Sequence, residues 1–220
     1  MSLQELNKEF IKLQNKYGAK ELDAICSGGL ADNPDICFVF MNPTGRNLSA
    51  SKSWKGLKAP WIGIKSAWNL FYELNLINKN IYHKIRNIKG SEWTEEFADE
   101  VYQSIANHKV YITNLGKCTQ LDARPLPDSV YEQYLGLLFK EIESVNPKKI
   151  ILFGNQVSSI VLGEKISVSQ VRKQRFEKQI NGKKYNFYSV YYPIGNGRIN
   201  IDKAIEDLQW IIKDKELVAT

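Results

Sequence analysis

Residues 36–47 read ICFVFMNPTGRN, and within them an apolar run changes abruptly into polar turn formers. Five apolar residues lead into Met41, and the polar stretch NPTGRN follows. A continuous apolar run bounded by turn formers predicts a strand that is buried on both faces, as in parallel sheets. Such sheets bind their ligands beyond the carboxyl ends of the strands. The stretch therefore predicts a parallel α/β fold with a candidate site that begins at Asn42.

Helical and strand periods alternate along the rest of the chain. Residues 109–114 and 148–154 predict strands, and residues 176–192 predict a hairpin because Asn181-Gly182 suits a type I′ turn. This alternation implies a three-layer α/β/α fold with a central, mainly parallel four-stranded sheet. No linker rich in Pro, Gly or Ser divides the chain, so we expect residues 1–220 to form a single domain. Helices are expected at residues 3–17, 62–76, 79–88, 93–106, 128–145, 155–163 and 202–213.

Composition narrows the class of protein. The formal net charge of +6 favours a polyanionic partner, although charge alone gives nucleic acid only even odds. No run of about 18 apolar residues could span a membrane, and the N-terminal helix lacks the apolar core of a signal peptide. Three cysteines, an odd number, indicate a reducing compartment rather than a disulfide framework. We therefore expect a cytoplasmic protein.

Three predicted strand ends carry polar motifs, which read FMNPTGRN, YITNLGKCTQLDARP and YSVYYPIGNGR. Their order and spacing resemble the uracil-DNA glycosylase superfamily. The first is similar to the GMNPG motif of its single-strand-selective and mismatch-specific branches. The segments APWIGIKSAWNLFYELNLI and ILFGNQVSSIVLG are similar to parts of its thermostable bacterial and archaeal branch. The resemblance spans roughly residues 20–212 and implies a uracil-DNA glycosylase-like fold.

The resemblance assigns the chemistry to two strand ends. Asn42 falls on the asparagine that orients a water toward the sugar, since an amide can position water without titrating; the alternative is an Asx turn that anchors its own loop. Tyr192 stands where the family has a histidine that donates to the base oxygen as negative charge develops. A tyrosine keeps a neutral O–H donor on a longer arm, so it either replaces that donor or marks altered or lost turnover.

The resemblance also implies residues that hold the base. Trp61 matches the aromatic that stacks on the flipped base, with an ordinary core tryptophan as the alternative. Asn114 matches the asparagine that reads the base edge, since an amide both donates and accepts; a turn-capping asparagine is the competing interpretation. Met41, beside Asn42, is expected to contact the base. Phe40 and Thr44 replace the two glycines of GMNPG, which puts the identity of the substrate in doubt.

Phosphate contacts are expected from Thr44, Lys55, Asn196 and Arg198. Arg198 falls on a loop arginine of the family, and a surface ion pair is its alternative role. Basic residues form one cluster beside the first motif and a second one later in the chain, and such charge runs are usually solvated surfaces. The first cluster is Lys52, Lys55, Lys58 and Lys65, and the second is Arg172, Lys173, Arg175 and Lys178.

No cofactor or metal is expected. The thermostable branch carries an iron–sulfur cluster on four cysteines, but here only Cys118 sits at a matching place, with Cys26 a poor second. Cys37 fits a buried strand position. His83 and His108 lack any metal-ligand spacing.

The leading hypothesis is a DNA glycosylase that hydrolyses the N-glycosidic bond of uracil or a related deaminated base after base flipping. The alternative is a catalytically impaired relative that binds nucleic acid or a nucleotide. A third, weaker possibility is a glycosylase for another modified base. The expected partner is DNA, single- or double-stranded, and the protein is expected to be a monomer without membrane contact.

Overall fold

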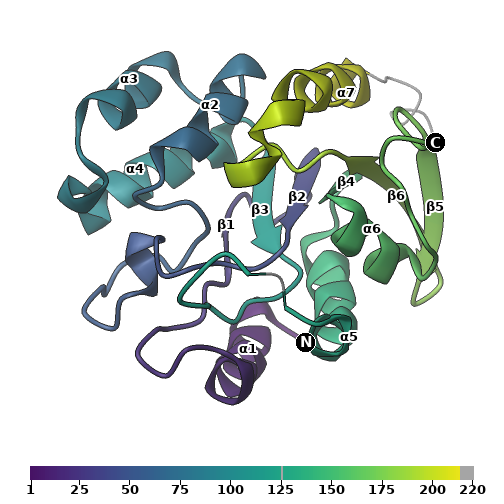
Figure 1. Ribbon diagram of the computed structural model, residues 1–220, viewed down its shortest axis with the longest axis horizontal. Helices are drawn as coiled ribbons and strands as arrows, with labels where there is room; N and C mark the ends of the chain where they lie inside the picture. Colours follow the sequence, from purple (N-terminus) through teal and green to yellow (C-terminus); the bar gives the residue numbers. More distant parts are fainter. Residues whose placement is uncertain (125, 214–220) are drawn as a thin grey trace.

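The computed structural model describes residues 1–124 and 126–213, apart from the side chain of Asn196. Figure 1 shows the helices packed around one sheet, which the strands form. The helices are α1 (Leu3–Tyr17), α2 (Lys65–Glu73), α3 (Lys79–Asn87), α4 (Glu95–Asn107), α5 (Asp128–Val145), α6 (Asn155–Leu162) and α7 (Ile201–Lys213). The strands are β1 (Ser27–Gly29), β2 (Ile36–Phe40), β3 (Val110–Asn114), β4 (Lys149–Phe153), β5 (Arg175–Ile180) and β6 (Lys183–Val190). Short 3₁₀ helices lie at η1 (Leu48–Ala50), η2 (Gly90–Glu92) and η3 (Gly195–Asn200).

In the described part of the chain the sheet has six strands, in the order β1-β3-β2-β4-β6-β5. The four inner strands, β3, β2, β4 and β6, are parallel, which confirms the predicted parallel sheet. The expected count of four falls short because an antiparallel strand extends each edge. At one edge β1 has the sequence Ser-Gly-Gly, which carries little strand propensity, so pairing with β3 rather than local sequence makes it a strand.

Both faces of the sheet are covered by helices, as three layers require. Alternate residues of a strand point to opposite faces, and all five residues of β2 are buried. Phe38 and Phe40 pack in the layer that contains α2, α3, α4 and α7. Cys37 and Val39 pack in the layer that contains α1, α5 and α6. The two groups of helices lie on opposite sides of the sheet in Figure 1.

Local sequence determines the turn of the β5–β6 hairpin, whereas the start of helix α2 also depends on tertiary contacts. Asn181 and Gly182 both have positive φ, at 45° and 87°, which is the type I′ turn that their sequence predicts. Helix α2 begins at Lys65 rather than near residue 62, because Trp61 and Gly63 both have positive φ, at 70° and 81°, which a right-handed helix does not allow. None of the described helices is long and apolar enough to cross a membrane.

Candidate functional site

The loops that follow β2 and β3 run side by side beyond the ends of both strands. Phe40 and Asn114, the last residues of the two strands, are Cα partners in the parallel ladder. The ladder continues into the loops, because the N–H of Gly116 donates to the carbonyl of Met41 at 2.8 Å. Asn42 and Asn114 therefore lie at the same edge of the sheet.

The amide of Asn42 is held from two directions. Its Nδ2 donates to the carbonyl of Pro43 at 3.2 Å, and its Oδ1 accepts from the hydroxyl of Tyr131 at 2.6 Å. An Asx turn would instead have Oδ1 accept a backbone N–H two residues on, and no described residue makes that bond. The side chain is only partly buried, so its remaining donor and lone pair can meet a ligand or water.

The backbone at Trp61 is strained, because a bulky aromatic rarely adopts positive φ. The Trp61 carbonyl accepts from the indole N–H of Trp68 at 3.2 Å and from the N–H of Ile64 at 3.0 Å, and these bonds stabilise the turn. Its own indole nitrogen is buried and has no described partner. Strain of this kind concentrates at functional sites, where the surrounding structure holds it in place.

Phe40 gathers the aromatic side chains of the site. Its ring stacks on Phe153 with centroids 4.3 Å apart and planes at 4°. Trp61 meets it edge-on at 4.9 Å, and Tyr192 meets it edge-on at 6.3 Å. Trp61 and Tyr192 therefore contact Phe40, Asn114 lies beside it in the ladder, and Asn42 follows it by two residues. We call Asn42, Trp61, Asn114 and Tyr192 the strand-end cluster.

Tyr192 presents a neutral hydroxyl. Burial raises its pKa to about 12, so it remains protonated far above neutral pH. No described residue forms a hydrogen bond with this hydroxyl. The backbone behind it fits only glycine at position 197, since an added Cβ there would lie 1.9 Å from the Tyr192 carbonyl oxygen. Gly197 therefore allows η3 to fold back against Tyr192.

Asn114 combines burial with an unused donor. Its side chain is 2% exposed, and its Nδ2 has no described partner. A buried amide donor without a partner is destabilising unless a ligand or water forms a hydrogen bond with it.

Met41, which was expected to contact the base, lies on the other side of the sheet from the aromatic rings around Phe40. Its side chain packs in the layer that contains α1, α5 and α6.

A buried ion pair supports the end of β3. The ammonium of Lys117 lies 2.8 Å from the carboxylate of Glu141 on α5, and both side chains are almost fully buried. The same ammonium donates to the main-chain carbonyl of Asn114 at 2.7 Å. Tyr111 and Thr113 donate to the other Glu141 oxygen, each at 2.8 Å, so both charges are satisfied. The network fixes the strand end that carries Asn114.

Most side chains of the two basic clusters already have partners within the described part of the chain. Lys58 pairs with Asp23 at 2.9 Å, and Lys65 donates to the carbonyl of Arg86. Lys55 is exposed, but its ammonium donates to the carbonyl of its neighbour Lys52 at 3.2 Å. In the second cluster, Arg172 pairs with Glu206 and Asp207 of α7, and Lys173 pairs with Glu206. Arg175 lies 3.9 Å from Glu177 on the same strand, and Lys178 donates to the carbonyl of Leu162 at the end of α6.

The loop after β6 offers free groups to the solvent. Arg198 is exposed and has no partner among the described residues. Ile199, which sequence reasoning missed, is 89% exposed. The sequence signal for it was an apolar residue within the polar loop GNGRIN. Thr44 is partly buried and forms a bridge with Gln120, whereas the side chain of Asn196 lies outside the described residues.

The described residues include no group of three or more His, Cys, Asp or Glu that could hold a metal ion. Cys26, Cys37 and Cys118 are free thiols. Cys118 is buried, and the side-chain amide of Gln120 lies 3.7 Å from its sulfur. These contacts leave its thiol inside the protein core.

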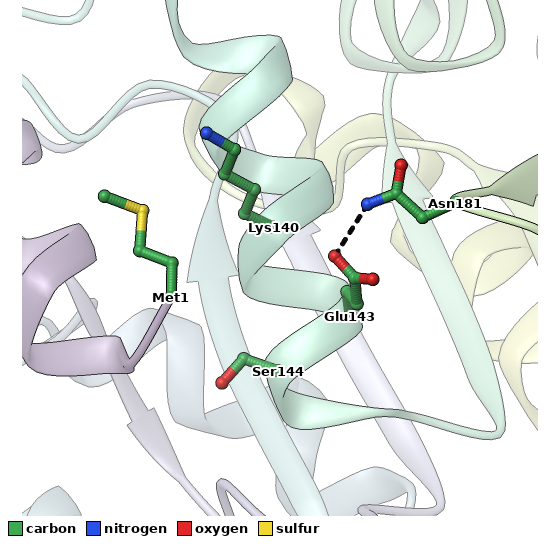
Figure 2. Close-up of a pocket in the computed structure, with 5 residues that line it drawn as sticks. All are labelled: Met1, Lys140, Glu143, Ser144 and Asn181. Atoms are coloured by element: carbon green, nitrogen blue, oxygen red, sulfur yellow. Dashed lines mark hydrogen bonds between the residues drawn. The ribbon is translucent and has the colours of Figure 1, made fainter.

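Two hollows of the surface can be compared with the position of the strand-end cluster. One of about 360 Å³ lies at the C-terminal end of α5, and Figure 2 shows Asn181 donating to Glu143 across it. That end of α5 is opposite to Tyr131, so this hollow belongs to another part of the molecule. A second, of about 290 Å³, lies next to the loop after β3. It is lined by Gly18, Ala19, Gln120, Leu121, Asp122, Arg124 and Leu126.

The arrangement at the strand ends suits a planar group with polar edges. It offers an aromatic side chain, unpaired amide and indole donors, and a hydroxyl donor within one cluster. A comparison with protein families places this cluster in a known context. The family model described as "Uracil DNA glycosylase superfamily" matches residues 30–209, which include the whole strand-end cluster.

Proposed function

The chain belongs to the uracil-DNA glycosylase superfamily, whose members are in general DNA glycosylases, and from this premise we propose that it hydrolyses the N-glycosidic bond of uracil or a related deaminated base in DNA. The observation that carries the proposal is the gathering of Asn42, Trp61, Asn114 and Tyr192 around Phe40. A glycosylase needs an aromatic face, base-edge donors, a positioned water and a donor for the departing base.

Each group has a defined part in the proposed reaction. The flipped base stacks on Trp61, and the unpaired Nδ2 of Asn114 donates to a carbonyl oxygen on its edge. Asn42 orients a water toward the sugar C1′. The bond between C1′ and the base nitrogen breaks, the base leaves with the bonding electrons, and the water oxygen bonds to C1′ as it loses a proton to solvent.

Tyr192 acts on the leaving base. As negative charge builds on the base oxygen, the tyrosine hydroxyl donates to it and lowers the barrier. A neutral donor suits this role because it does not need to be charged before the bond breaks. The pKa of about 12 keeps the hydroxyl protonated throughout the neutral range.

Exposed residues of the loops after β2 and β6 fit a DNA backbone and a base step. Arg198, Lys55 and the exposed Arg46 supply positive charge for phosphates. Ile199 projects from η3, and an apolar side chain of this size can enter a base stack and separate its steps. This would lower the cost of moving the target base out of the duplex.

A panel of oligonucleotides tests the proposal. It carries uracil, hypoxanthine or xanthine, each in single- and double-stranded form, and abasic sites are detected by alkaline cleavage. Release of any of these bases by the protein, and its loss in Asn42→Ala, supports the proposal. Tight binding to the modified DNA without abasic sites would instead support a binding protein that has lost the chemistry.

A further inference from the structure

Tyr131 reaches Asn42 from the opposite layer of the protein. It lies on α5 with a fully buried side chain, in the layer that contains α1, α5 and α6. Trp61 and Tyr192 pack in the other layer. Tyr131 nevertheless donates its hydroxyl to Asn42 Oδ1 at 2.6 Å. Helix α5 therefore contributes directly to the strand-end cluster, a link that no motif in the sequence indicates.

Glycine at position 116 allows this approach. A Cβ at this residue would lie 3.0 Å from the ring of Tyr131 and 3.4 Å from the Cβ of Asn42. The contact with the ring is tight, so a larger residue would press on Tyr131 where it approaches Asn42. The loop after β3 is thus shaped around their hydrogen bond.

The hydrogen bonds around Asn42 define which way its amide faces. The Tyr131 hydroxyl donates its proton to Oδ1. Burial raises the pKa of this hydroxyl, and the backbone of Leu126 acts on it in the direction that lowers its pKa, as a nearby N–H does. On the other side, the carbonyl of Pro43 can only accept, so it selects Nδ2. A flipped amide would place Nδ2 against the hydroxyl and leave the tyrosine proton without its acceptor, Oδ1. It would also place Oδ1 against a carbonyl.

We propose that Tyr131 is a positioning residue that locks the amide of Asn42, so that the free lone pair of Oδ1 and one N–H of Nδ2 face the reacting water. This inference rests on the proposed glycosidic hydrolysis, because it assigns to Tyr131 the orientation of the group that holds the water. Tyr131 itself touches neither base nor sugar, and it acts through Asn42.

The chain supplies a matched control in Tyr134. This tyrosine lies one turn further along α5 and is also fully buried, but its hydroxyl lies near Cys118 rather than Asn42 and forms no hydrogen bond with a described residue. The variant Tyr134→Phe removes the same hydroxyl from the same helix without changing the surroundings of Asn42. Any general effect of losing a buried hydroxyl from α5 will appear in both variants.

The first experiment compares Tyr131→Phe, Tyr134→Phe and the unchanged protein by single-turnover base release and by binding to modified DNA. We expect Tyr131→Phe to slow base release at least about tenfold, equivalent to about 1.4 kcal/mol in the barrier, with binding changed less than twofold. Tyr134→Phe should leave both quantities near those of the unchanged protein. Full activity in Tyr131→Phe, or equal losses in the two variants, overturns the inference.

The second experiment needs no activity. In Asn42→Asp, the Tyr131 hydroxyl should donate to the introduced carboxylate and hold its pKa low, because a hydrogen bond to the charged form favours that form. Adding Tyr131→Phe should raise this pKa by about one unit, whereas adding Tyr134→Phe should not. NMR titration of the carboxyl carbon measures it. Tyr192, Asp128 and Cys118, the titratable groups that act on Tyr131, are present in all three proteins.

The two readouts separate failure of the inference from failure of the proposed function. An unchanged carboxyl pKa on adding Tyr131→Phe overturns the inference whatever the activity. A raised pKa in a protein that releases none of the tested bases supports the contact between Tyr131 and Asn42, and it counts against the proposed hydrolysis instead.

Discussion

The rings of Trp61 and Phe40 meet edge-on, with centroids 4.9 Å apart and planes at 82°. This contact joins a loop residue to the last residue of a buried strand. Phe40 in turn stacks on Phe153 at the end of β4, so Trp61 rests on the rigid part of the sheet. A platform fixed in this way loses little conformational freedom when a base stacks on it.

The first prediction concerns this platform. Trp61→Ala should weaken binding to DNA that carries the target base by about 1–3 kcal/mol, the value of one base stacked on an aromatic side chain. Trp61→Phe should retain most of the affinity. Fluorescence anisotropy with a labelled oligonucleotide measures the change. Because Trp61 has positive φ, Trp61→Gly should melt at a higher temperature than Trp61→Ala while binding equally poorly. Equal affinity of the alanine variant and the unchanged protein would exclude stacking.

The second prediction separates water positioning from loop anchoring at Asn42. Asn42→Ala should lower the rate of base release by about 10²–10⁴, the range for a group that assists the attacking water, with little change in DNA binding. Asn42→Asp should keep part of the activity, since a carboxylate can also orient water and favours a positively charged sugar. Single-turnover kinetics and thermal melting test both variants. Parallel losses of stability and binding, with unchanged turnover per bound complex, would make Asn42 a loop anchor.

The third prediction uses the pKa of Tyr192. Tyr192→Phe should slow base release by about 10²–10³, the cost of one donor aimed at a developing anion. Burial raises the pKa of Tyr192 to about 12. The rate of the unchanged protein divided by the rate of Tyr192→Phe should therefore stay constant up to pH 10. It should fall only above pH 10, as the hydroxyl ionises. The same raised pKa means that the stabilising contribution of Tyr192 is complete below pH 10 and is lost toward pH 12. If the rate ratio already decreases at pH values lower than 9, this assignment is contradicted.

The fourth prediction concerns phosphate contacts. Arg198→Ala should weaken binding to all sequences alike, and it should reduce the slope of log affinity against log salt by about 0.9 for duplex DNA. Lys55→Ala should have the same kind of effect. Lys173→Ala is the control, because Lys173 is paired with Glu206 on α7. Salt titrations of binding measure the slopes, and an unchanged slope in Arg198→Ala would make this arginine an ordinary surface charge.

The fifth prediction addresses Ile199. Only a duplex has to be unstacked before the base is flipped, so Ile199→Ala should slow base release from duplex DNA by about tenfold and leave single-stranded DNA unaffected. Parallel assays on the two forms of one oligonucleotide provide the measurement. Ile11, another exposed apolar residue, lies on α1, and Ile11→Ala is the control. Equal slowing on both forms would argue against a wedge.

Local signals predicted much of the fold. The apolar run of β2, the Asn181-Gly182 turn and the periodicity of α1 and α5 act over a few residues, and the structure has each of these elements where the sequence predicts it. The start of α2 was missed because tertiary hydrogen bonds hold Trp61 in a conformation that its own preferences oppose. Strand β1 was missed for a similar reason, since only pairing with β3 makes it a strand.

The supports of the candidate site could not be predicted in the same way. Lys117 pairs with Glu141, and Asn42 bonds with Tyr131, over separations of 24 and 89 residues. No periodicity in the sequence connects such pairs, because they depend on where a whole helix lies on the sheet. The motif residues themselves were found because each follows a strand, where composition changes abruptly.

Part of the second basic cluster, Arg175 and Lys178, lies on the outermost strand β5. Among the described strands β5 pairs only with β6, so its other side is a sheet edge with unpaired backbone groups. Such an edge invites strand addition by another chain, and charged side chains oppose it. Arg175 and Glu177 are exposed on this strand and alternate with the partly buried Phe176 and Lys178. Charges on such an edge strand oppose pairing with another chain, so the basic character of Arg175 has a structural explanation that does not involve DNA.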